Sequence, residues 1–305
     1  MGSGAFAIPS FEALIDAGHE VVAAVTQPDK EKGRGRELAA PPMKPAALAR
    51  GVPVLQPRRI KLPEAQDEVR RLAPELQVIV AYGQILPRTV IDIAPRGTVN
   101  VHASLLPRYR GAAPIQWAIV NGETETGVTT MLIDEGLDTG PTLLARETPI
   151  GPEETAPELE QRLARLGAEV LLETVDGLVR GTITPQPQDH AQATLAPIIE
   201  KEQGRIDWTS TAHAIDCRRR GFFPWPGTTA VVDGRALKIL RTQVLAETGS
   251  EAPGTLIAVD RDGLVVACGA GTRLRLLEVQ PESRKAMPAA AFAAGARLAP
   301  GVRLG

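Results

Sequence analysis

The sequence has little cysteine, few aromatic residues and no long apolar run. Its two cysteines, Cys217 and Cys268, form no CxxC pattern, which argues against a disulfide scaffold and a thiolate zinc site. Aromatic residues make up only 3% of the 305 residues, which argues against recognition of single-stranded nucleic acid mainly by base stacking. No apolar run approaches the roughly 18–20 residues of a membrane-spanning helix, and no secretory signal is recognisable. We therefore expect a protein of the reducing cytoplasm without a membrane partner.

Net charge is also nearly absent, since the formal value is −2. This balance argues against a polycation that coats nucleic acid. The two parts of the chain differ, however: residues 1–190 contain 25 acids and 19 bases (net −6), and residues 191–305 contain 11 acids and 15 bases (net +4). Most bases are arginine (27, against 7 lysines), whose planar guanidinium suits phosphate groups. The C-terminal part therefore either meets an anionic partner or presents a solvated basic face.

Strand and helix patterns alternate in the first part of the chain. Continuous apolar runs of strand length are typical of strands buried on both faces of a parallel sheet. Such runs lie at residues 21–26, 76–82, 98–104, 128–133 and 142–146. Helical spacing lies at residues 9–18, 44–50, 63–72 and 156–181. This alternation predicts an α/β fold with a mostly parallel sheet.

The pattern changes after this part. Residues 182–207 are rich in proline and show little periodicity, and beyond them short apolar runs alternate with turns. Asp233-Gly234 and Asp262-Gly263 each stand between two such runs, which is a strong β-hairpin signal. We therefore predict one domain at 1–190, a linker at 191–206 and a small β-barrel or sandwich at 207–305.

Candidate catalytic residues lie in the segment TVNVHASLLPRYRG, which begins at Thr98. Because side chains alternate along a strand, Asn100 and His102 fall on one face. An amide beside an imidazole can stabilise an oxyanion and transfer a proton. Two satisfied polar residues at the end of a sheet would show the same pattern, so both interpretations stay open.

A loop after the next strand carries three acids, Asp134, Glu135 and Asp138. It would lie at the C-terminal edge of the sheet, where open α/β folds place their sites. Each acid is either a partner for His102 or a solvated loop charge.

Two basic segments are candidates for contact with an anionic partner. KEKGRGRE, with Arg34 and Arg36 around its glycines, is not a P-loop and is either a cationic contact loop or a solvated one. CRRRGFFPWP joins three arginines to three aromatic residues and is either an RNA-facing patch or part of a core. We favour the core for Phe222 and Trp225. Further candidates for phosphate contacts are Lys238, Arg241 and Arg275.

Long motifs resemble the formyltransferase family that uses 10-formyltetrahydrofolate. They are NVHASLLPRYRGAAPIQWAI, which begins at Asn100, and ETGVTTMLIDEGLDTGP, which begins at Glu125. TQPDKEKGRGRELAAPPMK, VIVAYGQILP and RIDW are similar to the members that formylate methionyl initiator tRNA. The resemblance covers nearly the whole chain. It implies a Rossmann-like catalytic domain at 1–190 and an OB-fold-like, tRNA-binding barrel at 207–305.

The resemblance also assigns roles to individual residues. The family's catalytic Asn, His and Asp match Asn100, His102 and Asp138. They imply direct transfer of the formyl group to an amine, with no covalent enzyme intermediate and no metal. The family's cationic loop contacts the acceptor end of the tRNA, and its central Arg matches Arg34. We expect Arg36 and Lys238 to be further tRNA contacts, and the enzyme to be a cytoplasmic monomer. The folate cosubstrate would be held by Val80, Ala81, Tyr82, Gly83, Ile85, Leu86, Ser104, Leu105, Leu106, Pro107, Asp134 and Gly136.

Four alternatives to this function remain at the level of the sequence. The acceptor could be an amino sugar nucleotide, a glycinamide ribonucleotide or water, or the chain could be an RNA-binding module without catalysis. The cationic loop and the C-terminal part favour tRNA, and the presence of Asn100, His102 and Asp138 together favours catalysis.

The start of the chain departs from the resemblance. Family members have a strand before the loop that matches the first residues here, and we expect Met1 to be an internal methionine with the true start several residues upstream. We accordingly expect the sequence as printed to be poorly soluble or inactive.

Overall fold

The computed structural model describes residues 1–32 and 37–305 and divides into two compact units. Unit 1 comprises Met1–Pro114, Thr126–Pro149 and Glu160–Ala196, and unit 2 comprises Ile115–Glu125, Ile150–Leu159 and Pro197–Gly305. Within the described residues, no helix has the length and apolarity that a membrane crossing requires.

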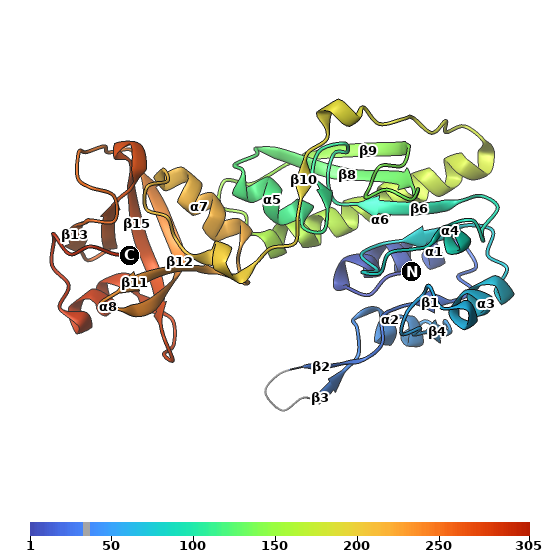
Figure 1. Ribbon diagram of the computed structural model, residues 1–305, viewed down its shortest axis with the longest axis horizontal. Coiled ribbons are helices and arrows are strands. Elements are labelled where there is room, and N and C mark those ends of the chain that lie inside the picture. Colours follow the sequence, from blue (N-terminus) through green and yellow to red (C-terminus); the bar gives the residue numbers. More distant parts are fainter. Residues whose placement is uncertain (33–36) are drawn as a thin grey trace. The chain divides into compact units, whose positions relative to one another are not determined.

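Unit 1 is the α/β part of the chain (Figure 1). Its helices are α1 (Ile8–Asp16), α2 (Met43–Ala49), α3 (Pro63–Arg71), α4 (Arg88–Ile91) and most of α6 (Ala156–Arg180). Its strands are β1 (Ala24–Val25), β2 (Lys30–Lys32), β3 (Glu37–Ala39), β4 (Val54–Leu55), β5 (Gln77–Ile79), β6 (Thr98–His102), β7 (Arg110–Gly111), β8 (Glu125–Leu132), β9 (Thr142–Pro149) and β10 (Leu195–Ala196). The predicted alternation of strands and helices is confirmed.

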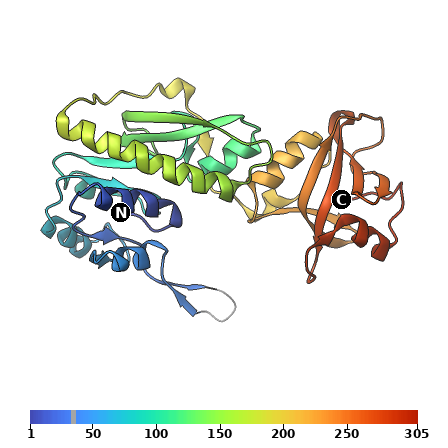
Figure 2. The same cartoon turned by 180° about the vertical axis from the view of Figure 1, so that it is seen from behind.

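The largest sheet of unit 1 has the order β5-β6-β8-β9. β5 and β6 are parallel and β6 and β8 are antiparallel, so the sheet is mixed. Figures 1 and 2 show α6 running across one face of this sheet. At Gly167 the helix approaches the sheet closely, since an added Cβ would lie 3.0 Å from Cγ1 of Val101 and 3.7 Å from Cγ1 of Val128. The apolar stripe of α6 therefore covers the strands that carry the candidate site.

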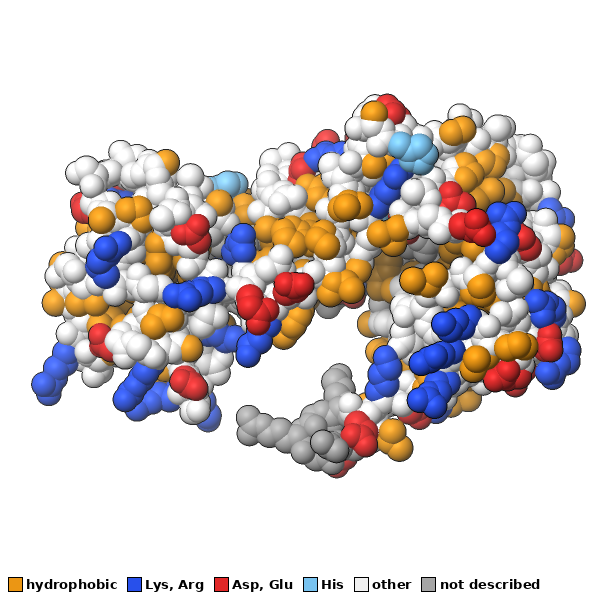
Figure 3. Space-filling view, in the orientation of Figure 1, with side chains coloured by type: hydrophobic (Ala, Val, Ile, Leu, Met, Phe, Trp, Pro, Cys, Tyr) orange, Lys and Arg blue, Asp and Glu red, His pale blue; other side chains and the backbone are white. Residues whose placement is uncertain are grey.

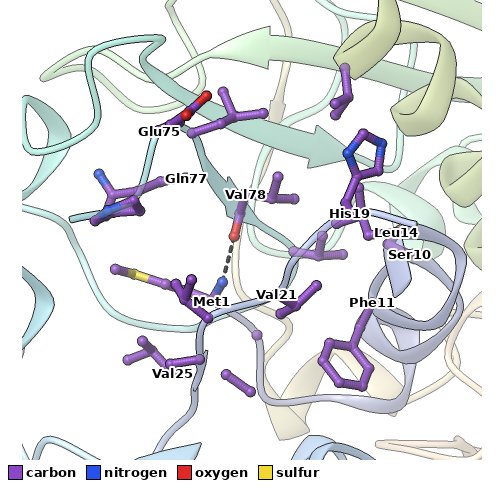
Figure 4. A pocket seen from close by; sticks show the side chains of 18 of the residues that line it. Met1, Ser10, Phe11, Leu14, His19, Val21, Val25, Glu75, Gln77 and Val78 are labelled. Carbon is purple, nitrogen blue, oxygen red and sulfur yellow. Dashed lines mark hydrogen bonds between the residues drawn. The ribbon is translucent and has the colours of Figure 1, made fainter. Parts of the chain in front are cut away.

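The first two residues lie between β1 and β5. The Gly2 N–H donates to the Val25 carbonyl (2.9 Å), the Val80 N–H donates to the Met1 carbonyl (2.9 Å), and the Met1 amine donates to the Val78 carbonyl. A largely apolar cavity of about 430 Å³ adjoins Met1 and is lined by residues 21–25 and 74–78 among others (Figure 4).

This arrangement corrects the strand expected at residues 21–26. The structure has a strand only at β1, where β4 pairs on one side and Gly2 bonds to Val25 on the other. Residues 21–23 line the cavity instead. Regular strand geometry needs ladder partners, and here these extend along only part of the apolar run.

Unit 2 is dominated by an antiparallel sheet of order β11-β12-β15-β14-β13, in which β16 also pairs with β15. Its strands are β11 (Thr228–Val232), β12 (Arg235–Leu245), β13 (Leu256–Asp260), β14 (Gly263–Ala267), β15 (Arg273–Pro281) and β16 (Met287–Pro288), and its helices are α5 (Pro114–Val120), α7 (Ala212–Gly221) and α8 (Ala289–Ala296). Both predicted hairpins are confirmed, since β11 pairs with β12 and β13 with β14. The inner face buries a core that includes Trp208, Leu237, Leu256, Leu264 and Leu274. Closure into an OB-like barrel stays a prediction.

The basic and aromatic segment at residues 217–226 of unit 2 is largely buried up to Phe222. Arg219 and Arg220 on α7 are 8% and 5% exposed and share the carboxylate of Asp216, so they are not an outward RNA-facing pair. Phe222 is fully buried, as expected, and meets Trp117 edge-on at 5.9 Å between ring centroids. The core interpretation is wrong for Trp225, which is 58% exposed.

Candidate active site

β6 carries the two central polar residues of the site. Asn100 lies opposite Ile79 of β5 and Met131 of β8, and His102 lies opposite Thr129 of β8. The spacing of two residues places both side chains on one face of the strand, as the sequence predicts. His102 is only 6% exposed, and Asn100 is half-buried.

The hydrogen bond of the His102 ring fixes its tautomer. Its Nε2 lies 2.9 Å from the Tyr109 carbonyl oxygen. Because a carbonyl only accepts, Nε2 carries the hydrogen and the neutral ring has its lone pair at Nδ1. Nδ1 lies 3.7 Å from Oδ2 of Asp138. The ring can therefore take a proton at Nδ1, and the carboxylate stabilises the resulting cation.

Asp138 is held in a loop with unusual backbone geometry. Its φ is +50°, in the left-handed region that non-glycine residues seldom adopt. Its Oδ2 accepts the Gly111 N–H at 2.8 Å. Asp134 organises the first half of the loop by accepting the Gly136 N–H (3.0 Å) and the Thr139 hydroxyl (2.6 Å) through Oδ1. The loop thus places Asp138 facing His102, whereas Asp134 stabilises the loop itself.

The segment after β6 is bound to β8 through Thr129. The Thr129 hydroxyl donates to the Ser104 carbonyl (2.7 Å) and accepts the Leu106 N–H (3.1 Å). The Ser104 hydroxyl in turn donates to the Arg108 carbonyl at 2.6 Å. These bonds fix the path of residues 104–107, all of which the sequence resemblance assigns to folate.

The loop after β5 presents backbone and one apolar side chain. Gln27 Nε2 donates to the carbonyls of Tyr82 and Gly83, both at 3.0 Å. Ile85 is 94% exposed, and Leu137 in the Asp138 loop is 63% exposed. Tyr82 instead packs in the core with Ile60 and Val90, so its ring is not available to a ligand.

The residues predicted from the sequence thus fall into three groups. The structure brings His102 and Asp138 together and places Asn100 on the same strand as His102. Arg34 and Arg36 lie outside the described residues. Lys238 lies on β12 of unit 2 and is half-buried. In the described part of the chain, no three His, Cys, Asp or Glu side chains are grouped closely enough to hold a metal ion.

Sequence reasoning missed the residues that brace the Asp138 loop. Gln188 and Arg110 are 8% and 6% exposed and bond to each other, and Gln188 also donates to the Asp138 carbonyl in this loop. β10 pairs with β7, so the proline-rich stretch beside Gln188 is bound to the site. Its lack of periodicity gave no signal of these contacts.

Comparison with known proteins places this geometry in a family. The pattern of the formyl transferase family matches residues 1–175, and the pattern of the formyl transferase C-terminal domain matches residues 198–297. The chain belongs to the formyl transferase family.

The chain is also similar over its full length to individual relatives. Methionyl-tRNA formyltransferase of Geobacter sulfurreducens is 51% identical over 305 residues, which is 100% of this chain and 95% of the relative. Methionyl-tRNA formyltransferase of Solibacter usitatus is 54% identical, with 100% and 97% covered. An N-formyltransferase from Helicobacter canadensis, solved with folinic acid and dTDP-3-aminofucose, shares the fold with a TM-score of 0.68 at 18% identity, covering 92% of this chain and 97% of that one.

Proposed function

We propose that this enzyme transfers the formyl group of 10-formyltetrahydrofolate to the α-amino group of methionyl initiator tRNA. The observation that carries the proposal is the pairing of His102 with Asp138 beside Asn100, in a chain about half identical to methionyl-tRNA formyltransferases over its whole length. Residues 1–190 would catalyse the transfer and residues 207–305 would bind tRNA. We expect a monomer that works in the cytoplasm.

The proposed reaction is a direct displacement at the formyl carbon. The neutral α-amine attacks this carbon, and the carbonyl oxygen becomes an oxyanion. The bond to the folate nitrogen then breaks, that nitrogen takes a proton, and the amine loses one. The mechanism needs no covalent intermediate on a cysteine, and Cys217 and Cys268 are both buried.

The three residues divide this work. The Asn100 amide stabilises the oxyanion, and one such donor contributes about 3–4 kcal/mol to the transition state. His102 holds its Nε2 hydrogen on the Tyr109 carbonyl, so Nδ1 is the atom that accepts and returns the proton. As a cation, His102 also donates from Nδ1 to the oxyanion. Asp138 offsets that charge from 3.7 Å.

The exposed apolar side chains support the position of the folate. Ile85 and Leu137 belong to two loops that flank the strands of the site, and their exposed side chains would supply the apolar part of the folate pocket. The backbone of residues 80–83 and 104–107 and the loop of Asp134 and Gly136 would supply polar contacts to the pteridine ring.

The acceptor is assigned by relatives and by charge. Arg34 and Arg36 would contact the acceptor end of the tRNA, and Lys238 would contact its backbone. Figure 3 shows lysine and arginine side chains spread over the visible face of unit 2, among acidic ones. Arg34→Ala should weaken tRNA binding and lower its dependence on salt, because each phosphate contact releases counterions.

A labelled-donor assay tests this function. The protein is incubated with 10-formyltetrahydrofolate labelled in the formyl group and with charged initiator tRNA, free methionine or amino sugar nucleotides. Label on the methionine of the tRNA is expected. Label only on a sugar would identify a different acceptor, label only in formate would identify a hydrolase, and no transfer at all would favour a binding module.

A further inference from the structure

Gln188 lies beside the active site without touching the groups that react. It is 8% exposed and belongs to the segment between α6 and β10. We propose that Gln188 is a positioning residue, which holds the backbone of the Asp138 loop so that the Asp138 carboxylate faces Nδ1 of His102. This inference rests on the proposed function, since it assigns Asp138 a role in transferring the proton.

All of the hydrogen-bonding capacity of the Gln188 amide is used. Its Nε2 donates to the carbonyls of Asp138 (2.9 Å) and Gly140 (2.7 Å). Its Oε1 accepts from Nε (3.1 Å) and Nη2 (2.6 Å) of Arg110. The reversed amide would place N–H groups against the guanidinium and an oxygen against two carbonyls. The orientation is therefore fixed by its partners.

The loop requires such an anchor. With a φ of +50°, Asp138 occupies a sparsely populated backbone conformation that persists only where surrounding contacts impose it. The turn also packs closely against the end of β8, because an added Cβ at Gly140 would lie 1.9 Å from the Leu132 carbonyl oxygen. Gln188 binds the carbonyls on both sides of this turn and thus supplies the imposed contact.

Gln188 also couples the loop to β7. Arg110 leads directly into Gly111, whose N–H donates to Oδ2 of Asp138. The Asp138 backbone is therefore fixed through Gln188, and its carboxylate is fixed through Gly111. Arg110 joins these two points, so the separation between Asp138 and His102 depends on the amide of Gln188.

The substitution Gln188→Glu tests the donor half of this arrangement. It keeps an oxygen for Arg110 but places a second oxygen against the carbonyls of Asp138 and Gly140. We expect kcat to fall about 10–100-fold, because displacing a catalytic group by about 1 Å costs up to about 10²-fold. The KM values for folate and tRNA should change less than about threefold. The matched control is Gln161→Glu, an exposed glutamine on α6, which should leave kcat unchanged.

A double-variant cycle separates positioning from general stability. In an Asp138→Asn background, Gln188→Glu should lower the residual rate less than about twofold, because the group that it positions is already lost. If Gln188→Glu does not fold, Gln188→Met serves in the same cycle, since it removes the donors without adding charge.

The outcomes distinguish this inference from the proposed function. A folded and soluble wild-type protein that formylates no tRNA would overturn the function itself. A wild-type protein that is active, with a Gln188→Glu penalty that is absent or equal in both backgrounds, would overturn only the role of Gln188.

Discussion

Substitution of Asp216 gives the strongest test of the interactions that stabilise unit 2. It is 9% exposed, and its Oδ1 accepts from Nε (3.2 Å) and Nη2 (3.0 Å) of Arg219 and from the Thr242 hydroxyl. Its Oδ2 accepts from Nε of Arg220 at 2.9 Å. Asp216→Ala would leave two buried guanidinium groups without the carboxylate that they share. Removing one partner of a buried ion pair costs about 3–5 kcal/mol in the free energy of unfolding.

Tryptophan fluorescence reports the loss of stability in unit 2 specifically. All three tryptophans, Trp117, Trp208 and Trp225, belong to unit 2, whereas both tyrosines belong to unit 1. The transition followed by tryptophan in urea should move to a lower midpoint with little change in slope. For a unit of this size the loss corresponds to a drop in Tm of roughly 10–20 °C.

The control is an acid of the same unit outside the network. Asp262 lies in the β13–β14 turn, 56% exposed in its side chain, so Asp262→Asn should change the free energy of unfolding by less than about 0.5 kcal/mol. If Asp216→Ala cost no more than Asp262→Asn, the buried network would not be what holds α7 to β12.

Three further outcomes are expected. Gly140→Ala should abolish formyl transfer and lower the Tm, because the added Cβ would collide with the Leu132 carbonyl. Activity assays and calorimetry measure these effects, and normal activity would contradict the loop geometry. Burial raises the pKa of Tyr82 to about 12, so the folded state favours the neutral phenol. Its contribution to the free energy of unfolding is complete below pH 10 and is lost as the pH rises through about 12, by up to about 3 kcal/mol. Absorbance should show a late tyrosine ionisation that Tyr82→Phe removes; ionisation of Tyr82 near pH 10 in the folded protein would refute its burial. Ile85→Ser should raise the folate KM about 3–10-fold at an unchanged Tm, and an unchanged KM would exclude Ile85 from the folate contact.

Local patterns predicted much of the fold. The apolar stripe from residue 156 to 181 corresponds to α6 (Ala156–Arg180), and the Asp-Gly pairs correspond to two hairpins. Both are determined by neighbours in the sequence, through helical periodicity and turn geometry. The pairing of His102 with Asp138 was also anticipated, because the motifs that carry them occur together in a family.

Features that depend on distant partners could not be predicted. The run of arginines on α7 contains no signal that Arg219 and Arg220 share a buried acid while Trp225 is exposed. The short β1 reflects which ladder partners are present, which an apolar run does not encode. Gln188 bonds to groups 48 to 78 residues away, so only the folded chain brings it to the site.

The most direct test of the mechanism is the single-turnover rate of formyl transfer to methionyl initiator tRNA. Asn100→Ala should slow this step about 10²–10³-fold, and His102→Ala and Asp138→Asn about 10²–10⁴-fold. Binding of folate and of tRNA, measured separately, should change less than about threefold. Folded variants that transfer the formyl group at the wild-type rate, or that lose only binding, would contradict the assignment of these three residues to the reaction.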